Sequence, residues 1–485
     1  MNNSLKDILY KVPIIAIAGP SNQKITNINT DSRKVKENNL FIALKGFESD
    51  GHEYIQESID NGANSVVCLK FPKTLKDSNT YIKVANTNNA LAIISGNFYD
   101  NPSRKLKLVG ITGTNGKTTI SNLLFEVFNN LSNKAGLIST INIKYGDKEF
   151  ESKQTTPDVL TTNFLLSEMV KHNIEYCFME VSSHGISQGR IEELQFAGGV
   201  FTNLTHDHLD YHKNFKDYRD VKKLFFDRLP KTAFSLVNYD DKNALFMLQN
   251  TVSSKFGYAM HNYADFNIKI LECEFHGMLV KINNHELWTR LLGDFNASNL
   301  LGVYGVSILL GLLESDVLRS ISMLKNVAGR FQTFQYNKNG LVIIDYAHTP
   351  DALENVIDTI NQIRTKNENL ITIIGCGGDR DKDKRYQMGR IASEKSDKII
   401  FTSDNPRNEE PNAIIDQMFK GVRPEDFKKV LSVEKREMAI KTAKHISGDS
   451  DIILIAGKGH ENYQEIKDYK LPFNDFLIAK KYFKN

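Results

Sequence analysis

The residues with the clearest chemical potential form a glycine-rich run, TGTNGKTT, at positions 112–119. An apolar segment typical of a buried strand, 106–111, precedes it, and a segment with apolar residues at helical spacing, 120–128, follows it. A glycine loop between a strand and a helix N-terminus directs backbone N–H groups at an anion, while a lysine adds charge and a hydroxyl can reach Mg²⁺. An ordinary strand-to-helix turn is the alternative, because Ile111 stands where the usual P-loop pattern has a glycine. The sequence favours a nucleotide-phosphate site formed by Gly113, Thr114, Asn115, Gly116, Lys117, Thr118 and Thr119.

A glutamate, Glu180, closes the apolar strand expected at 176–181. The carboxyl end of a strand is where ligands bind in open α/β sheets. A charge in such surroundings is either a ligand to a cation or a structural charge with its own partners. The sequence leaves both possibilities open.

A lysine, Lys222, lies in the apolar stripe of the helix expected at 218–229. Lys223 and Asp227 of the same helix are expected away from that stripe. An unpaired buried lysine is costly, and snorkelling of the ammonium to the surface is its ordinary explanation. The residues that share the face of Lys222 by helical spacing are Tyr218, Phe225, Phe226 and Leu229.

The composition is that of a globular protein, with 41% hydrophobic and 25% charged residues among 485. A net charge of +3 without a dense Lys/Arg block gives no reason to expect a nucleic-acid partner. The apolar run 300–313 is shorter than the ~20 residues of a membrane helix, so we expect a core helix and no membrane insertion. The run 12–18 ends like a signal-peptide cleavage site, but its apolar core is very short. The widely spaced cysteines fit a reducing compartment, and we expect a cytoplasmic protein: Cys68, Cys177, Cys273 and Cys376.

The order of elements predicts an α/β protein, and its length suggests about three domains at ~150 residues each. Strands are expected at 40–44, 64–69 and 136–143, helices at 52–61 and 88–100, and short strands over 251–292. A helix is expected to start with Thr156 as N-cap and Pro157 at its first position, and another with Thr349 and Pro350. Buried strands within 341–348, 371–378, 398–404 and 451–457 alternate with helices in the last part. We place the domains at 1–87, 88–331 and 332–485.

Several strings along nearly the whole chain resemble the Mur ligase family, whose members use ATP to join an amine to a carboxylate. They are TGTNGKTT, DSR at 31–33, EVSSHG at 180–185, DHLDYH at 207–212, GDFNASN at 293–299, GRF at 329–331, DYAHTPD at 345–351, DNPR at 404–407 and GKGHE at 457–461. The resemblance implies a central P-loop-type ATP-binding domain, an N-terminal domain for a UDP-linked substrate, and a C-terminal Rossmann-like α/β domain that binds an amino acid. It departs at 473–476, FNDF, which lacks the arginine usual in the family.

The family's motifs carry roles onto matching positions here. ATP contacts are implied for the glycine loop and for Asn296, Asn299, Arg330, Asp345 and His348. Contacts to the UDP substrate are implied for Ser32, Phe47, Glu48, Ser49, Gln154, Thr155, Thr156, Ser182, Gln188 and Arg190. Two Mg²⁺ ions are implied, held by Thr118, Glu180, His208 and a Lys222 carbamylated by CO₂. The histidines around His208 do not have the spacing of a zinc site. The implied catalytic residues are Lys117, Lys222, Glu180 and His208.

The DNPR string resembles the branch that adds meso-diaminopimelate, which is lysine with a second carboxylate that a guanidinium can grip bidentately. The residues implied for this amine are Arg380, Asp404, Asn405, Pro406, Arg407, Gly457 and Glu461. The implied reaction adds meso-diaminopimelate to the D-glutamate γ-carboxylate of UDP-N-acetylmuramoyl-L-alanyl-D-glutamate through an acyl phosphate, in peptidoglycan biosynthesis. We expect a monomer whose partners are these small molecules. A lysine-adding ligase and a folylpolyglutamate synthetase-like ligase are the alternatives in the same fold, and a P-loop kinase or a plain nucleotide-binding protein are alternatives outside it.

Overall fold

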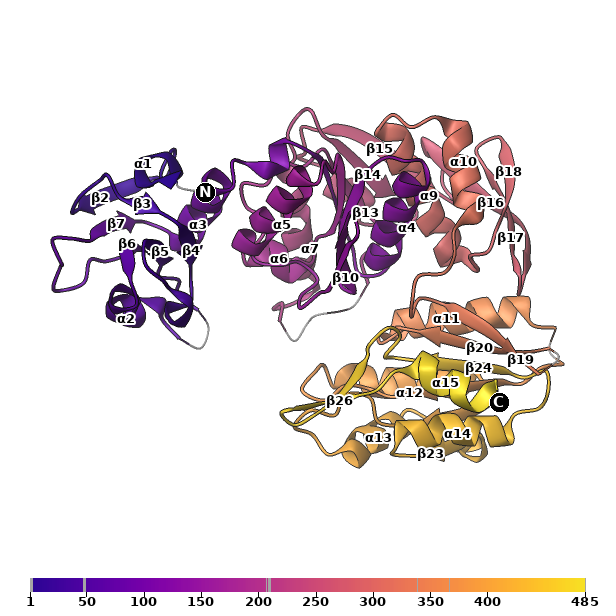
Figure 1. The fold of residues 1–485 in the computed structure, drawn as a ribbon. Helices are drawn as coiled ribbons and strands as arrows, with labels where there is room; N and C mark the ends of the chain where they lie inside the picture. Colours follow the sequence, from indigo (N-terminus) through magenta and orange to yellow (C-terminus); the bar gives the residue numbers. More distant parts are fainter. Residues whose placement is uncertain are drawn as a thin grey trace. The chain divides into compact units, whose positions relative to one another are not determined.

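The computed structural model describes residues 3–46, 49–205, 207, 211–337, 339–365 and 367–484. The chain divides into two compact units. The first contains Met1–Gly110, Asn133–Gly199 and Arg228–Ala233, and the second contains Ile111–Ser132, Val200–Asp227 and Phe234–Asn485. Each unit combines helices with β-sheets, so the predicted α/β class is confirmed (Figure 1).

The first unit begins with a five-stranded sheet in the order β2-β7-β6-β5-β4. Strands β4 to β7 run parallel, and β2 runs antiparallel to β7. Apolar side chains of β5, β6 and β7 form one buried cluster with α3. The predicted strands 40–44 and 64–69 and the helix 88–100 are confirmed with small shifts of their ends. The elements are β1 (Asn3–Ser4), α1 (Leu5–Ile8), β2 (Ile14–Ala18), β3 (Lys24–Ile25), β4 (Asn27–Asn29), η1 (Ser32–Lys34), β5 (Asn39–Ile42), η2 (Gly51–Tyr54), α2 (Ile55–Asp60), β6 (Ala63–Cys68), β7 (Thr80–Val84), α3 (Thr87–Phe98) and η3 (Pro102–Arg104).

The rest of the first unit contains strands in the order β11-β10-β9-β12-β8. The segment 136–143, predicted as one strand, forms parts of β9 and β10, which are antiparallel. The chain reverses because the Ser139 hydroxyl accepts hydrogen bonds from the backbone N–H groups of Ile141 and Asn142, at 3.2 and 3.1 Å. The elements are β8 (Lys107–Thr112), which runs on into the second unit, β9 (Ala135–Ile138), β10 (Asn142–Tyr145), β11 (Lys148–Glu151), α5 (Val159–Lys171), β12 (Tyr176–Glu180) and α6 (Ser183–Ser187).

The start of α5 differs from the prediction. Asp158, not Thr156, is the N-cap, and its carboxylate accepts a hydrogen bond from the Thr161 backbone N–H at 2.9 Å. The Thr156 hydroxyl instead donates to the backbone oxygen of Glu180 at 2.9 Å. Both residue types cap helices well, so the tertiary partner of Thr156 decides between them.

The second unit begins with strands in the order β13-β14-β15-β16-β17-β18. Strands β14, β15 and β16 run parallel, and β16, β17 and β18 form an antiparallel meander. Helix α9 is buried along most of its length, which confirms the predicted core helix. The elements are α4 (Lys117–Asn130), β13 (Gly198–Phe201), α7 (Phe215–Asp227), β14 (Phe234–Asn238), α8 (Ala244–Met247), β15 (Ser254–Ala259), β16 (Phe266–Glu274), β17 (Gly277–Ile282), β18 (His285–Thr289), α9 (Asp294–Leu309) and α10 (Glu314–Met323).

The last part of the chain is a six-stranded sheet in the order β19-β20-β24-β21-β22-β23. Its strands run parallel except for β19, and the continuous β-branched runs of β20, β21 and β24 are buried on both faces. Helices α14 and α15 pack side by side on one face (Figure 1). Thr349 caps α11 and Pro350 opens it, as predicted. The elements are β19 (Gln332–Tyr336), β20 (Gly340–Asp345), α11 (Pro350–Ile363), β21 (Leu370–Ile374), α12 (Asp383–Lys395), β22 (Lys398–Phe401), α13 (Pro411–Phe419), η4 (Pro424–Lys429), β23 (Val430–Ser432), α14 (Arg436–Ile446), β24 (Ile452–Ala456), β25 (Tyr463–Ile466), β26 (Tyr469–Pro472) and α15 (Asp475–Phe483).

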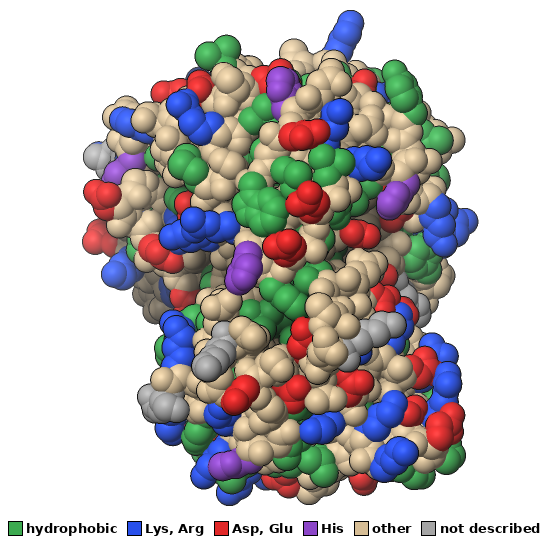
Figure 2. Space-filling view, turned by 90° about the vertical axis from the view of Figure 1, so that its right-hand side faces the viewer, with side chains coloured by type: hydrophobic (Ala, Val, Ile, Leu, Met, Phe, Trp, Pro, Cys, Tyr) green, Lys and Arg blue, Asp and Glu red, His purple; other side chains and the backbone are tan. Residues whose placement is uncertain are grey.

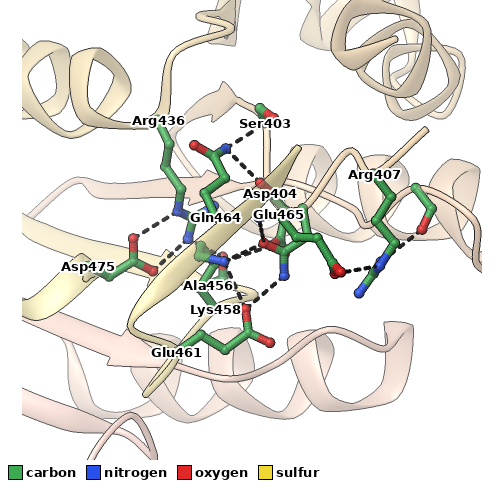
Figure 3. Close-up of polar contacts among 12 residues, drawn as sticks. Ser403, Asp404, Arg407, Arg436, Ala456, Lys458, Glu461, Gln464, Glu465 and Asp475 are labelled. Atoms are coloured by element: carbon green, nitrogen blue, oxygen red, sulfur yellow. Dashed lines mark hydrogen bonds and ion pairs between the residues drawn. The ribbon is translucent and has the colours of Figure 1, made fainter. Parts of the chain in front are cut away.

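A fully buried ion pair ties α14 to α15 (Figure 3). The Arg436 guanidinium donates to both carboxylate oxygens of Asp475, at 2.8 Å each, and also to the backbone oxygen of Ala456 at 2.8 Å. Ala456 ends β24, directly before the glycine of the GKGHE segment. The C-terminal segment that departs from the family pattern is therefore anchored through Asp475, beside the end of β24.

We expect the substitution Asp475→Asn to lower the free energy of unfolding by about 3–5 kcal/mol, because it leaves the Arg436 charge buried without its counter-charge. A urea titration followed by circular dichroism measures the change. Lys481→Met removes an exposed ion pair of the same helix, Lys481 with Glu437, and should leave the transition unchanged. Equal midpoints for Asp475→Asn and the wild type would show that the buried pair contributes little.

The face drawn in Figure 2 carries positive and negative side chains interspersed with one another. No helix in the described part of the chain is long and apolar enough to cross a membrane. The cysteines are all free thiols, and burial raises the pKa of Cys68 and of Cys376 to about 11.

Candidate active site

The glycine loop joins β8 to α4, as predicted. Gly116 takes the N-cap position of α4 with a φ of 88°, and a Cβ there would lie 2.5 Å from the side-chain oxygen of Asn299. Both the left-handed backbone and the close approach require glycine at this position. The Ile111 side chain, which stands where the usual pattern has glycine, is buried within β8 and leaves the loop intact.

The charged and hydroxyl groups of the loop lie close together. The Lys117 ammonium donates to the backbone oxygens of Gly113 and Thr114, at 2.9 and 2.7 Å. The Thr118 hydroxyl accepts a hydrogen bond from the Arg330 guanidinium at 3.2 Å. Arg330 comes from the GRF string, so the structure brings this predicted residue to the first turn of α4.

A cavity of about 280 Å³ opens beside the loop. The predicted residues that line it are Asn115, Gly116, Thr119, Asn299, Arg330, Asp345 and His348. Asn296 does not line it, and its side-chain amide instead donates to the Leu292 backbone oxygen at 2.9 Å in the first turn of α9. Lining residues that the sequence did not single out include Asn203, Asn238, Asp240, Phe295, Tyr346 and Asn355. Phe295 lies inside the GDFNASN string and Tyr346 inside the DYAHTPD string, so these two residues could have been predicted from the resemblance.

Arg330 brings a guanidinium to the lining of this cavity. The guanidinium carbon of Arg330 lies 4.5 Å from the centroid of the Tyr346 ring, and its Nε is buried without a hydrogen-bond partner within the described residues. Asp345 accepts hydrogen bonds from the backbone N–H groups of Phe331 and Ala347, at 2.7 Å each. It therefore holds the backbone directly after Arg330 and directly after Tyr346. Burial raises the pKa of Asp345 and lowers that of His348 to about 4, so His348 is neutral near pH 7.

Lys222 is 1% exposed, which excludes snorkelling. Its ammonium donates to the Gly113 backbone oxygen at 3.0 Å and lies 4.8 Å from the centroid of the Tyr218 ring. Burial and the nearby Lys117 charge lower the pKa of Lys222 well below its ordinary value, although Asp207 acts in the opposite direction.

Lys223 differs from its prediction, because it is also buried, with 6% exposure. Its ammonium contacts both carboxylate oxygens of Asp227, at 2.5 and 2.8 Å. This ion pair between residues four apart on the helix compensates for the burial.

Glu180 lies fully buried at the end of β12 in the first unit, as predicted. Its carboxylate accepts hydrogen bonds from the Thr140 backbone N–H and hydroxyl, at 2.7 and 3.0 Å. The Thr140 hydroxyl also contacts the Thr155 hydroxyl at 3.1 Å.

The residues predicted for the sugar-peptide part of the substrate gather next to Glu180. Arg190 donates to the side chain of Gln154 and to the Thr156 backbone oxygen, at 2.8 and 2.7 Å, and also contacts the Gln188 side chain. The Thr156 hydroxyl lies 3.1 Å from that of Ser182, which in turn caps α6. The structure therefore brings together Gln154, Thr155, Thr156, Ser182, Gln188 and Arg190.

The N-terminal sheet carries a second cavity, of about 560 Å³. Ser32 and Ser49, both predicted, line it, and the Ser32 hydroxyl donates to the Glu57 carboxylate at 3.0 Å. Tyr54 and Glu57 also line it and were missed, because they stand in a helical segment without a distinctive string.

Three of the residues predicted to bind the amine, Asp404, Asn405 and Glu461, form a buried polar cluster (Figure 3). The Asn405 side-chain amide donates to the Glu461 carboxylate at 2.8 Å, and Asp404 is only 6% exposed beside it. At the centre lies Lys458, which the sequence analysis missed and which is fully buried. Its ammonium contacts Asn405, Glu461 and Asp404 at 2.9, 2.8 and 3.4 Å. Burial and the Asp404 charge raise the pKa of Glu461.

Arg407 and its loop lie next to this cluster. The Arg407 guanidinium donates to the Glu465 carboxylate at 2.9 Å and to the Gly378 backbone oxygen at 2.8 Å. A Cβ on Gly377 would lie 3.1 Å from Arg407 Nη1 and 3.7 Å from Arg380 Cγ, so both predicted arginines flank this glycine. Pro406 is buried, and Gly457, at φ 109°, approaches the Asp404 carboxylate.

A second arginine, Arg385, holds this loop and was also missed. It donates to both carboxylate oxygens of Glu409 and to the Gly377 backbone oxygen, at 2.8, 2.8 and 3.0 Å. Its hydrogen bonds lower the pKa of Glu409 to about 2.

Some predicted residues lie outside the described part of the chain: Phe47, Glu48 and His208. His206, Leu209 and Asp210 lie outside it too. Among the residues that are described, no group of three or more His, Cys, Asp or Glu side chains is arranged to hold a metal ion.

The fold defines an α/β protein with a glycine loop between a strand and a helix of one sheet and a separate buried polar cluster on another sheet. Family models match three consecutive segments of the chain. They are the Mur ligase family catalytic domain at 24–99, the Mur ligase middle domain at 111–307, and the Mur ligase glutamate ligase domain at 329–459.

Curated relatives match nearly the whole chain. The UDP-N-acetylmuramoyl-L-alanyl-D-glutamate–2,6-diaminopimelate ligase of Phocaeicola vulgatus is 48% identical over 481 residues, covering 99% of each chain. The ligase of the same name from Cytophaga hutchinsonii is 49% identical over 477 residues, covering 98% of each. The chain therefore belongs to the Mur ligase family, with its three-domain architecture and Rossmann-like C-terminal domain.

Solved structures agree with this fold. A structure of a UDP-N-acetylmuramoyl-L-alanyl-D-glutamate–2,6-diaminopimelate ligase is 28% identical, with a TM-score of 0.71, covering 100% of this chain and 99% of that one. MurF from Thermotoga maritima in complex with ADP has a TM-score of 0.63 at 16% identity, covering 89% of this chain and 93% of that one. A folylpolyglutamate synthase from Thermotoga maritima covers 76% of this chain and 90% of its own, with a TM-score of 0.58 at 15% identity. These last two likenesses concern the fold alone.

Proposed function

We propose that this chain is the ATP-dependent ligase that joins meso-diaminopimelate to the D-glutamate γ-carboxylate of UDP-N-acetylmuramoyl-L-alanyl-D-glutamate in peptidoglycan biosynthesis. The observation that carries the proposal is the buried cluster of Asp404, Asn405, Lys458 and Glu461 with Arg407 next to it. Acidic and amide acceptors suit an amino group, and a guanidinium suits a carboxylate. The names of the relatives at 48% and 49% identity support the same substrates.

The reaction needs activation, because a carboxylate is a poor electrophile towards an amine. A γ-carboxylate oxygen attacks the terminal phosphorus of ATP, ADP leaves, and an acyl phosphate forms. The amine nitrogen then attacks the acyl carbon, loses a proton and expels inorganic phosphate. Both steps develop negative charge on phosphoryl oxygens, so preorganised cations matter most.

The residues of the glycine loop are assigned to the ATP phosphates. Lys117 and the loop N–H groups hold the β and γ phosphates, with Arg330 adding charge from the cavity wall. The unpartnered buried Nε of Arg330 supports this role, because such a donor is expected to have an acceptor. Asn299 and His348, which line the same cavity, are assigned to the rest of the nucleotide. Asp345 holds the backbone next to Arg330 and Tyr346 through the hydrogen bonds that it accepts from Phe331 and Ala347.

Mg²⁺ fits the donor set of this chain. Thr118 offers a hydroxyl at the start of α4, and Glu180 offers a buried carboxylate at the end of β12. These are the hard oxygen ligands that Mg²⁺ prefers, and His208 is a further candidate. When bound, Mg²⁺ neutralises charge on the transferred phosphoryl group.

Lys222 is proposed to carry a carbamate. Its neutral amine can attack CO₂, forming an N–C bond and releasing a proton, and the product is an anionic oxygen ligand. Burial of the free amine and its lowered pKa support the assignment, since only the neutral amine reacts.

For the sugar-nucleotide substrate, the N-terminal cavity with Ser32 and Ser49 is assigned to the uridine diphosphate end. The group of Thr155, Thr156 and Arg190 is assigned to the peptide end. We retain the division into domains at 1–87, 88–331 and 332–485, a monomeric state and a cytoplasmic location as parts of the proposal.

A lysine-adding ligase and a folylpolyglutamate synthetase-like ligase would keep this chemistry. The first does not need Arg407 for its amine, which lacks the second carboxylate. The second does not need the sheet and cavity of residues 24–99, which match a Mur ligase model of their own.

The experiment that tests the proposal measures phosphate release from ATP with UDP-N-acetylmuramoyl-L-alanyl-D-glutamate, Mg²⁺ and one amine at a time. We expect release with meso-diaminopimelate, and much slower release with L-lysine or without an amine. Faster release with L-lysine would favour the lysine-adding alternative.

A further inference from the structure

Arg407 stands in a strained loop that the hairpin β25-β26 holds in place. Its φ is 49°, in the left-handed region that a residue with a Cβ adopts at a cost. The Arg407 N–H donates to the Glu465 backbone oxygen at 3.1 Å, and the Lys467 N–H donates to the Arg407 backbone oxygen at 2.8 Å. The Glu465 N–H in turn donates to the Asn405 side chain at 2.9 Å. Strand β25 therefore pairs with the DNPR segment and sets its backbone.

The side chain of Glu465 continues this contact (Figure 3). Its carboxylate accepts a hydrogen bond from Arg407 Nε at 2.9 Å, while Arg407 Nη1 donates to the Gly378 backbone oxygen at 2.8 Å. Two bonds on different nitrogens fix the plane of the guanidinium. Arg407 Nη2 has no hydrogen-bond partner within the described residues. The side chain is 22% exposed, so a ligand can reach it.

We propose that Glu465 is a positioning residue that presents the guanidinium of Arg407 to the second carboxylate of the amine. The inference rests on the proposed function and extends it to a residue that contacts Arg407 instead of the substrate. A long arginine side chain that is already fixed loses less conformational freedom when it binds a carboxylate. The conformational freedom of the guanidinium is already lost in the folded protein, so binding of the substrate does not have to restrict it further.

The alternative role of Glu465 is competition with the substrate carboxylate for Arg407. A carboxylate next to Arg407 also competes for its charge, and then removal of Glu465 would tighten amine binding. The geometry favours positioning, because Glu465 engages Nε and leaves Nη2 for a ligand. An arginine has five N–H donors, enough for two carboxylates at different edges.

The test compares the variants Glu465→Ala and Glu465→Gln at saturating ATP and UDP substrate. We expect Glu465→Ala to raise the KM for meso-diaminopimelate about tenfold or more, the scale of one lost charge-assisted hydrogen bond, with kcat and the KM for ATP within about twofold of the wild type. Glu465→Gln should stay near the wild-type KM, because its amide oxygen can accept the same Nε–H bond. Asp468→Ala, an exposed acid in the turn of the same hairpin, is the matched control.

A double variant separates positioning from a general effect on the fold. In an Arg407→Met background, Glu465→Ala should change the KM no further, because the two residues act as one unit. An unchanged or lower KM for Glu465→Ala alone, or full additivity with Arg407→Met, would overturn the inference while leaving the proposed function intact. Absence of wild-type turnover with meso-diaminopimelate would overturn both.

Discussion

Replacement of Lys222 by methionine is expected to lower kcat at least ~10²-fold, the scale of removing one stabiliser of transition-state charge. Methionine matches the apolar stem of the lysine but cannot form a carbamate. The wild type, depleted of CO₂, should lose activity and regain it on addition of bicarbonate, whereas bicarbonate should not restore Lys222→Met. Phosphate release with and without bicarbonate measures both effects. The exposed Lys216 of the same helix provides the control, Lys216→Met.

The sign of the pH dependence follows from the lowered pKa of Lys222. A free lysine binds its proton below about pH 10, and because burial lowers the pKa of Lys222, the unfolded chain binds this proton more tightly than the folded chain. Protonation therefore favours unfolding over this range, and removal of the amine should not lower the urea midpoint at neutral pH. An inactive Lys222→Met that is also unfolded would show a structural role, and full turnover would show that the carbamate is not needed.

Replacement of Lys117 by methionine is expected to cost at least ~10²-fold in kcat/KM for ATP, because this ammonium is the mobile charge of the phosphate loop. Its hydrogen bonds to the backbone oxygens of Gly113 and Thr114 hold the ammonium against the glycine loop. Steady-state kinetics and a direct ADP-binding titration measure the effect on turnover and on nucleotide affinity.

The exposed Lys134, which follows α4, gives the control Lys134→Met. We expect the kcat of Lys117→Met to stay below that of the wild type at every ATP concentration, because the ammonium is expected to stabilise the transferring phosphoryl group. Recovery of the wild-type kcat at high ATP would reduce Lys117 to a ground-state binding residue.

Much of the fold follows from patterns that are local in the sequence. The apolar β-branched runs that became β21, β22 and β24 are buried on both faces, so their signal does not depend on neighbours. The start of α5 was wrong because Thr156 and Asp158 are both good caps, and the choice depends on a tertiary bond from Thr156 to Glu180. The split of 136–143 into two strands depends on a serine turn that resembles strand sequence.

The site was predictable where a string is contiguous and less so where a partner comes from elsewhere. The place of Lys222 on the apolar face of its helix follows from helical spacing alone, whereas its complete burial is seen only in the structure. Arg385 was missed because its partner Glu409 lies 24 residues away along the chain, and Lys458, although it lies inside the GKGHE string, was missed because its bond to Asn405 spans 53 residues. Glu465 is a further example, since nothing in its local sequence indicates that it meets Arg407.

The central claim is that this chain selects an amine by its second carboxylate, and a competition measures that most directly. The enzyme is given equal concentrations of meso-diaminopimelate and L-lysine with limiting UDP-N-acetylmuramoyl-L-alanyl-D-glutamate, ATP and Mg²⁺, and the product masses are compared. The account predicts almost exclusively the diaminopimelate product from the wild type, and a loss of this preference in Arg407→Met. A predominant lysine product from the wild type, or an unchanged preference in Arg407→Met, would contradict it.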